Sequence, residues 1–143
     1  MKKLLLLSAL LIFACSSGGD SNDNNNSSQN SFLNVRYEVT TTGDPENPSE
    51  NWGEITYTNV TGNENYFSTN ELYWESEIQI EIIRDDFGNI DYSQSISYVL
   101  LDANIQGGND TALTIAKIFI NNELEAESIA EQGADAYAIH YFY

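Results

Sequence analysis

From Leu33 to the end of the chain, apolar and polar residues alternate in short runs that are separated by turn-forming residues. Alternation with a period of two is typical of β-strands that bury one face. In the first run the apolar positions are Leu33, Val35, Tyr37 and Val39. The pattern predicts seven or eight strands, at Leu33–Thr41, Gly53–Val60, Tyr66–Asn70, Tyr73–Arg84, Tyr92–Ala103, Thr111–Asn121, Ala136–Tyr143 and, as the one left open, Leu124–Ile129.

The residues between these runs favour turns. Both prolines lie in Gly43–Asn51, a predicted loop, and Asp85–Asp91 is a predicted turn. Asn121 and Asn122 tolerate the left-handed backbone angles of a two-residue hairpin turn. Residues Glu123–Glu131 also have a helix-forming composition, so a helix stays open as an alternative there. Seven or eight short strands without a long helix predict an all-β fold, an antiparallel β-sandwich of about 110 residues. Within it, Tyr92–Ala103 is apolar on both faces and is expected to be a central strand.

The N-terminus has a different pattern. Lys2 and Lys3 precede the apolar or small run Leu4–Ala14, and the only cysteine, Cys15, follows directly. A basic start, a short apolar core and a small residue at the cut are typical of a secretory signal. Eleven residues of helix span roughly 16 Å, about half of a bilayer core, so we do not expect this run to be a membrane-spanning anchor.

The end of this run resembles the lipobox of bacterial lipoproteins, in which the signal is cut just before a lipidated cysteine. Ile12, Ala14 and Cys15 fit that pattern, and Phe13 is bulkier than usual. We expect cleavage between Ala14 and Cys15 and lipid attachment at Cys15, where several acyl chains form a stable anchor. The alternative is a secreted protein with a chance cysteine at its cleavage site.

The next segment, Ser16–Asn30, contains no apolar residue. It cannot form a core and is predicted to be a flexible tether with a root-mean-square span of roughly 20 Å. The expected organisation is therefore a signal peptide at 1–14, the lipidated cysteine and tether at 15–31, and one β-sandwich domain at 32–143.

Charge narrows the function classes. The chain has 22 acidic and 5 basic residues, for a formal net charge of −17. Loss of the signal leaves Arg36, Arg84 and Lys117 against the 22 acidic residues, a charge of −19. Such a surface repels nucleic acid and anionic lipid, so we exclude nucleic acid as a partner. A single cysteine also excludes an internal disulfide.

Few residues carry reactive chemistry. The only histidine, His140, lies in a predicted strand among aromatic residues, where we expect a partly exposed structural residue and not part of a Ser–His–acid device. The chain has no Cys/His cluster for zinc and no phosphate-binding loop, so we expect no catalytic residue, cofactor or metal. Asp85–Asp91 places oxygen ligands around a turn, but it lacks EF-hand spacing and the closing glutamate. A hairpin turn is the favoured interpretation over a calcium site.

Two surface motifs leave alternatives open. Tyr73 and Trp74 are either an exposed recognition patch or, as we expect for the tryptophan, a plug of the core. Asp110-Thr111-Ala112 resembles the O-glycosylation signal of some envelope proteins of Gram-negative bacteria. We therefore consider Thr111 a candidate O-glycosylation site.

Five segments in order resemble MmpS-type transport accessory proteins, and the resemblance covers nearly all of residues 33–142. They are Val35–Thr40, Ile55–Asn59, Leu72–Trp74, Ser97–Gly107 and Lys117–Leu124. The resemblance implies an immunoglobulin-like β-sandwich outside the inner membrane, serving a resistance-nodulation-division type transporter that exports lipids or siderophores. The family's late cysteine pair is missing, with Ala116 at the first position, and a lipid replaces the family's transmembrane helix.

The expected function is that of a lipid-anchored binding module of the cell envelope, not an enzyme. Its expected partners are the membrane, through lipidated Cys15, and a transporter or another envelope protein. The alternative is a cell-surface interaction or structural lipoprotein unrelated to transport. The expected location is the outer membrane of a Gram-negative bacterium, on its periplasmic or surface face.

Overall fold

The computed structural model of the protein describes residues 31–42, 52–106, 112–131 and 133–143. These residues form eight strands and no helix: β1 Ser31–Thr41, β2 Trp52–Thr58, β3 Glu64–Thr69, β4 Tyr73–Ile82, β5 Tyr98–Gln106, β6 Leu113–Ile120, β7 Glu123–Glu131 and β8 Ala136–Tyr141. The all-β prediction is therefore confirmed. Within these ranges, no helix of the length and apolarity needed to cross a membrane is present.

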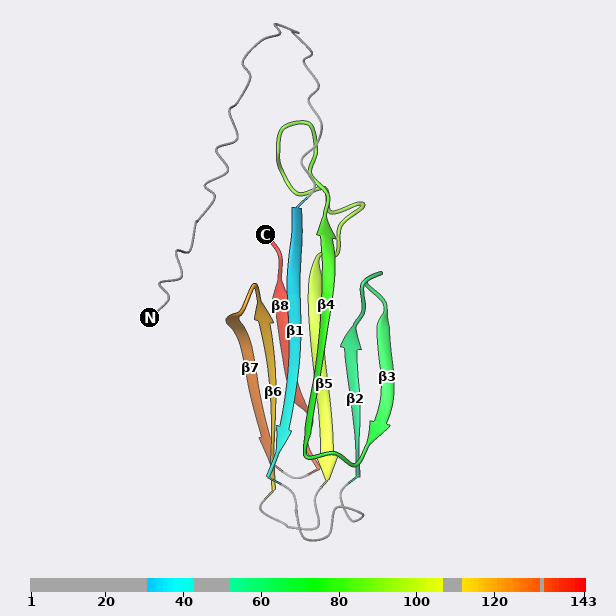
Figure 1. Ribbon diagram of the computed structural model, residues 1–143, viewed down its shortest axis with the longest axis vertical. Helices are drawn as coiled ribbons and strands as arrows, with labels where there is room; N and C mark the ends of the chain where they lie inside the picture. The colour runs from blue at the N-terminus through cyan, green and yellow to red at the C-terminus, as the bar shows by residue number, and fades with distance from the viewer. Residues whose placement is uncertain (1–30, 43–51, 107–111, 132) are drawn as a thin grey trace, which may run out of the picture.

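The strands form two four-stranded sheets that pack against each other (Figure 1). We call them the β1 sheet, with the order β4-β1-β6-β7, and the β5 sheet, with the order β3-β2-β5-β8. All neighbouring pairs are antiparallel. The predicted antiparallel β-sandwich is thus confirmed, with eight strands. Residues Glu123–Glu131, for which a helix was the alternative, form strand β7 beside β6.

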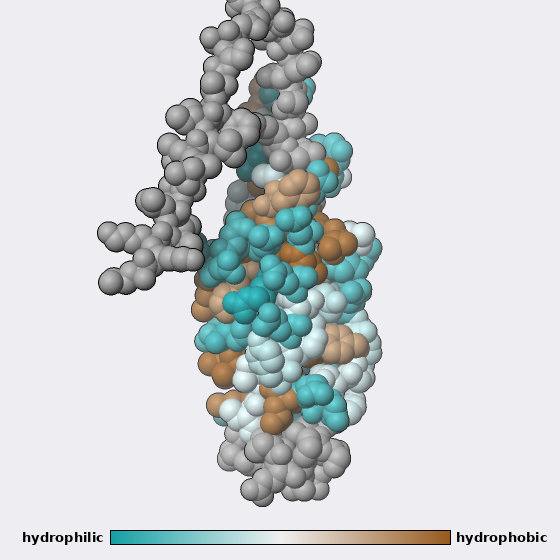
Figure 2. Space-filling model, in the orientation of Figure 1, coloured by the Kyte–Doolittle hydropathy of each residue, from teal (hydrophilic) through white to brown (hydrophobic). Residues whose placement is uncertain are grey.

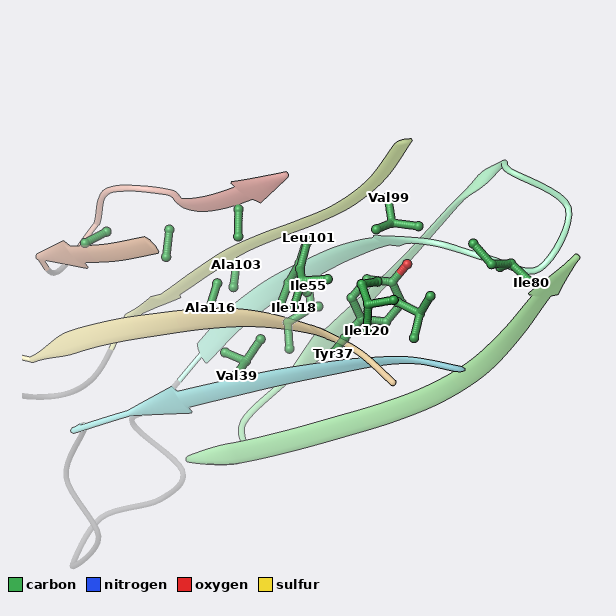
Figure 3. Close-up of a cluster of buried hydrophobic side chains, with 14 of the residues drawn as sticks. Tyr37, Val39, Ile55, Ile80, Val99, Leu101, Ala103, Ala116, Ile118 and Ile120 are labelled. Atoms are coloured by element: carbon green, nitrogen blue, oxygen red, sulfur yellow. The ribbon is translucent and has the colours of Figure 1, made fainter. Parts of the chain in front are cut away.

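Alternate side chains of each strand fill the space between the sheets. Tyr37 and Val39 of β1 have no exposed area, as the period of two predicts. Figure 3 shows these side chains with Ile118 from the same sheet, facing Ile55 and Leu101 of the β5 sheet. The core is therefore built from the inward positions of both sheets, as expected for a sandwich.

Strand β5 lies between β2 and β8, which confirms its predicted central position. The burial of both faces that suggested this position is limited, however. Val99 and Leu101 face the core, and on the outer side Leu100 is also buried, whereas Tyr98 is exposed.

The predicted strand Tyr92–Ala103 begins too early, because its first six residues form turns and loop. Asp91 is the physical reason. Its backbone carbonyl accepts hydrogen bonds from the N–H groups of Gln94 (3.1 Å) and Ser95 (2.9 Å), and its carboxylate accepts one from the N–H of Ser93 (3.0 Å). These local bonds satisfy backbone groups that a strand would pair with a neighbour.

Several predicted features lie outside the described residues: the signal segment 1–14 with Ala14, the lipidation site Cys15, and Thr111. The tether lies outside them too, except for Ser31, the first described residue, which begins β1. The start of β1, the end of β4 and the end of β8 all lie at one end of the sandwich (Figure 1). The chain that follows Cys15 therefore enters the domain at this end.

Candidate functional site

A pocket opens at the end of the sandwich where β1 begins and where β4 and β8 end. Its volume is about 410 Å³, and we call it the end pocket. Small-molecule sites usually occupy roughly 300–1,000 Å³, so this pocket has the size of a ligand site. Its apolar lining consists of Leu33, Ile82, Ile90, Ile120 and Phe142.

The apolar lining is an extension of the core. Ile82 ends β4 and Ile120 ends β6, and both side chains are buried, as is Phe142 directly after β8. Leu33 packs against the same cluster. The end pocket is therefore the open end of the space between the two sheets, where the inward-facing rows run out.

Arg84 is the cationic side chain of the end pocket. It is half-buried, and its Nη1 donates a hydrogen bond of 2.9 Å to the backbone carbonyl of Gly88. The other two cations of the domain are paired with carboxylates, Arg36 with Glu38 at 2.7 Å and Lys117 with Glu127 at 3.8 Å. Among the described residues, no carboxylate forms such a pair with Arg84.

Two acidic residues near Arg84, Asp85 and Asp91, accept hydrogen bonds within their own turns. The Asp85 carboxylate accepts hydrogen bonds from the N–H groups of Phe87 (2.9 Å) and Asn89 (2.8 Å). These bonds and the Asn89 side chain, which makes the largest contribution, lower the pKa of Asp85. The pKa of Asp91 is lowered as well, first by the hydroxyl of Ser93. Both carboxylates therefore hold the backbone of this segment in place.

The backbone of Asp85–Asp91 turns back on itself. Arg84 and Ile90 form an antiparallel bridge, and the N–H of Asp85 donates a 2.8 Å hydrogen bond to the carbonyl of Asn89. The favoured hairpin turn is confirmed. Among the described residues, no group of three or more His, Cys, Asp or Glu side chains is arranged to hold a metal ion.

His140 lies in β8 on the wall of the end pocket, with 24% of its side chain exposed, so the predicted partly exposed strand residue is confirmed. Its Nδ1 lies 3.6 Å from a carboxylate oxygen of Glu125, and its ring centroid lies 5.1 Å from that of Phe142. In the part of the chain that the structure describes, no hydrogen bond joins His140 to a serine hydroxyl. The contacts of His140 are those of a wall residue.

A second feature is the outer face of the β5 sheet, which carries Tyr66, Tyr98, Tyr137, Tyr141 and Trp52. We call this surface the tyrosine face. These five aromatic side chains are between 37% and 60% exposed. The rings of Tyr98 and Tyr141 are cross-strand neighbours, with centroids 6.0 Å apart.

Acceptor groups lie among these rings. One cross-strand row contains Tyr66 of β3, Thr56 of β2, Asp102 of β5 and Tyr137 of β8. One Asp102 carboxylate oxygen is buried and has no hydrogen-bond partner. Desolvation, and then the charges of Asp135 and Glu64, raise the pKa of Asp102. The tyrosine face therefore combines exposed rings with carboxylates.

The face of the molecule seen in Figure 2 is mostly polar, with hydrophobic residues in separate patches. Of the two alternatives for Tyr73 and Trp74, exposure on the surface applies to Tyr73 and packing against the core applies to Trp74. Tyr73 is 50% exposed, whereas Trp74 is partly buried against the core. The Trp74 ring lies 5.2 Å from the rings of both Tyr57 and Phe67, which belong to the opposite sheet. Trp74 thus closes the sandwich along β4, which confirms its expected structural role.

Comparison of the chain with models of protein families and with curated proteins gave no match. Neither the end pocket nor the tyrosine face was predicted from the sequence. The end pocket is assembled from the ends of β1, β4, β6 and β8, which are far apart along the chain. The tyrosines, by contrast, stand at alternate positions of predicted strands, so a survey of outward-facing aromatic residues would have found the tyrosine face.

Proposed function

We propose that this protein is a lipid-anchored binding module of the bacterial cell envelope and that its tyrosine face holds a protein partner. The observation that carries the proposal is this face, on which Tyr66, Tyr98, Tyr137 and Tyr141 expose their rings together. Tyrosine is enriched at protein interfaces because its ring supplies apolar contact area while its hydroxyl stays hydrogen-bonded.

The charges of the tyrosine face indicate the kind of partner. Glu54 and Glu64 share its outer side with Asp102, and the hydroxyl of Tyr66 donates a hydrogen bond to Glu54. Carboxylates beside aromatic rings complement Lys and Arg side chains, which form ion pairs with the carboxylates and cation–π contacts with the rings. The partner surface is therefore expected to be basic, opposite in sign to this acidic chain.

The anchor in this proposal is Cys15. Its support is the sequence Lys2, Lys3, the apolar run and the single cysteine at the predicted cut. The described residues begin at Ser31, at one end of the sandwich, and no described strand covers the outer face of the β5 sheet.

The partner that the MmpS-type resemblance suggests is a subunit of a resistance-nodulation-division type transporter. A cell-surface interaction or structural lipoprotein is the second candidate. The second is favoured by Ala116, a fully buried residue at the place of the family's first late cysteine, and by the lipid that would replace the family's transmembrane helix.

Metabolic labelling with a radioactive fatty acid tests the anchor. The wild-type chain is expected to incorporate label, and Cys15→Ser is expected to lose it. Labelling of the Cys15→Ser chain at the wild-type level would refute the lipid claim.

Crosslinking in cells tests the tyrosine face. A photoreactive residue at Thr56, in the middle of the face, should capture a protein partner, and Tyr66→Ala should reduce that capture. Tyr73→Ala is the matched control, because Tyr73 is similarly exposed and also donates a hydrogen bond to a glutamate, but from β4 of the other sheet.

Three outcomes separate the candidates. Capture of a transporter subunit that Tyr66→Ala reduces supports the accessory role, and capture of another envelope protein supports the second candidate. Absence of any Tyr66-dependent crosslink would overturn the binding proposal.

A further inference from the structure

The end pocket combines an apolar interior with one cation. Ile82, Ile120 and Phe142 of its lining are almost completely buried, while Arg84 on the same lining is half-buried. A second cavity of about 400 Å³ shares Arg84, Ile90 and Tyr143 with it. Arg84 therefore lies where the apolar end of the core meets a more polar surface cavity.

An apolar cavity next to a cation complements a molecule with an alkyl chain and an anionic head. We propose that the end pocket binds such an amphiphile, a fatty acid or an alkyl phosphate, with its chain against Leu33, Ile82 and Ile120 and its head group on Arg84. This site is separate from the tyrosine face, and the proposal does not depend on the proposed protein partner.

The electrostatic setting of Arg84 supports an anionic head. In a domain with a large excess of acidic residues, an arginine is expected to find a carboxylate, as Arg36 and Lys117 do. The neighbouring carboxylates of Asp85 and Asp91 instead accept hydrogen bonds from backbone N–H groups of their own turns. The guanidinium has five N–H donors, and Gly88 accepts from one nitrogen, so donors remain for a carboxylate or phosphate.

The acidic side chain on the lining of the end pocket is Glu125. Its carboxylate lies 3.6 Å from Nδ1 of His140, another residue of the pocket lining. The negative charge of the whole chain repels an anion at long range, but salt screens that repulsion beyond about 8 Å at physiological ionic strength. Contact with Arg84 and burial of the alkyl chain act at shorter distances and outweigh it.

Calorimetric titration tests the proposal. The protein is the chain from residue 15 onward with Cys15→Ser, so that its own acyl chains cannot occupy the pocket. Dodecanoate, below the concentration at which it forms micelles, is expected to bind saturably with one site per chain. Acetate, which is the head group alone, and dodecyltrimethylammonium, which has the opposite charge, are expected to bind at least about ten-fold more weakly.

Arg84→Gln removes the cation but keeps a side chain of similar shape, and it is expected to weaken dodecanoate binding by about ten-fold or more. Arg36→Gln is the matched control. It makes the same change of charge on the outer face of the β1 sheet, where Arg36 lies over the ring of Phe119 at 3.8 Å, and it should leave the affinity unchanged. Equal weakening by both variants would overturn the role of Arg84.

Methyl resonances locate the bound chain without any substitution. Dodecanoate is expected to shift the methyl signals of Leu33, Ile82 and Ile120. Lack of saturable binding, or shifts confined to residues outside the end pocket, would overturn the proposal.

Discussion

The Tyr37 hydroxyl donates a 2.8 Å hydrogen bond to the backbone carbonyl of Thr58 and so connects the two sheets inside the core. Tyr37 belongs to β1 and has no exposed area, and Thr58 is the last residue of β2 in the opposite sheet. The Thr58 hydroxyl in turn accepts a 3.0 Å hydrogen bond from the N–H of Leu100. A short polar chain therefore links β1, β2 and β5 through an otherwise apolar interior.

Removal of the Tyr37 hydroxyl tests the value of this link. Tyr37→Phe keeps the ring but leaves the Thr58 carbonyl without this donor, so the free energy of unfolding is expected to fall by about 1–3 kcal/mol. Urea unfolding measures the change. Tyr98→Phe, on the exposed outer face, is the control and should change stability by less than about 0.5 kcal/mol. Equal effects of the two variants would contradict a special role for Tyr37.

Burial of Tyr37 also predicts a dependence on pH. Desolvation, and then the nearby Tyr57, raise the pKa of the folded-state Tyr37 phenol above its ordinary value of 10.0. Above pH 10 the unfolded chain loses this proton while the folded chain keeps it, so the unfolded state binds fewer protons and stability falls as pH rises. The slope from this group is at most about 1.4 kcal/mol per pH unit.

The Tyr37→Phe variant lacks this titration. The stability advantage of the wild type over the variant is therefore expected to shrink by about 1 kcal/mol between pH 9 and pH 11. Urea unfolding at both pH values measures it. A constant advantage across this range would show that the Tyr37 phenol has an ordinary pKa in the folded protein.

The alternation of side chains predicted seven or eight strands, because a strand that buries one face must place apolar residues at every second position. The described residues form eight, and the doubtful one, for which a helix was the alternative, is β7. The boundary error at Tyr92 had a different origin. Residues there have the composition of a strand, but Asp91 and Ser95 bind neighbouring backbone groups, and the Ser95 hydroxyl both donates to the carbonyl of Ile83 and accepts from its N–H. Such side-chain bonds depend on the position of Ile83, twelve residues away, and local composition does not reveal them.

The candidate sites were less predictable than the fold. Tyr66 and Tyr137 lie in one row across the β5 sheet because the strand order is β3-β2-β5-β8 and the register aligns them. The end pocket depends further on where each strand ends. Arg84 is left without an ion pair to Asp85 because the Asp85 carboxylate accepts hydrogen bonds from backbone N–H groups of its own turn. Order, register and strand ends are tertiary properties, which periodicity does not encode.

The backbone angles of the hairpin between β6 and β7 determine which residues are tolerated at Asn122. Asn121 and Asn122 have φ angles of 51° and 71°, as a type I′ turn requires. Asn122→Ala is expected to lower the free energy of unfolding by about 1 kcal/mol, because a Cβ without a compensating side chain is strained in this region. Asn122→Gly is the control and should leave stability equal or higher. Urea unfolding measures both, and equal losses would indicate that the asparagine side chain, and not the backbone, stabilises the turn.

Gly53 in β2 is the described glycine at which substitution by alanine is expected to destabilise the protein most. A Cβ at this position would lie 2.6 Å from Cγ1 of Ile105 and 2.8 Å from both the Ile105 Cα and the Asn104 carbonyl oxygen. Backbone atoms of β5 cannot move aside without disturbing the pairing of β2 with β5, so Gly53→Ala is expected to destabilise the protein by roughly 2–3 kcal/mol.

Gly88→Ala is the comparison, because a Cβ there meets no atom within 4 Å and only the positive φ of 84° opposes it. Its expected cost is about 1 kcal/mol. Thermal and urea unfolding measure both variants, and a Gly53→Ala protein as stable as the wild type would show that β2 and β5 are less closely packed at this position than the structure indicates.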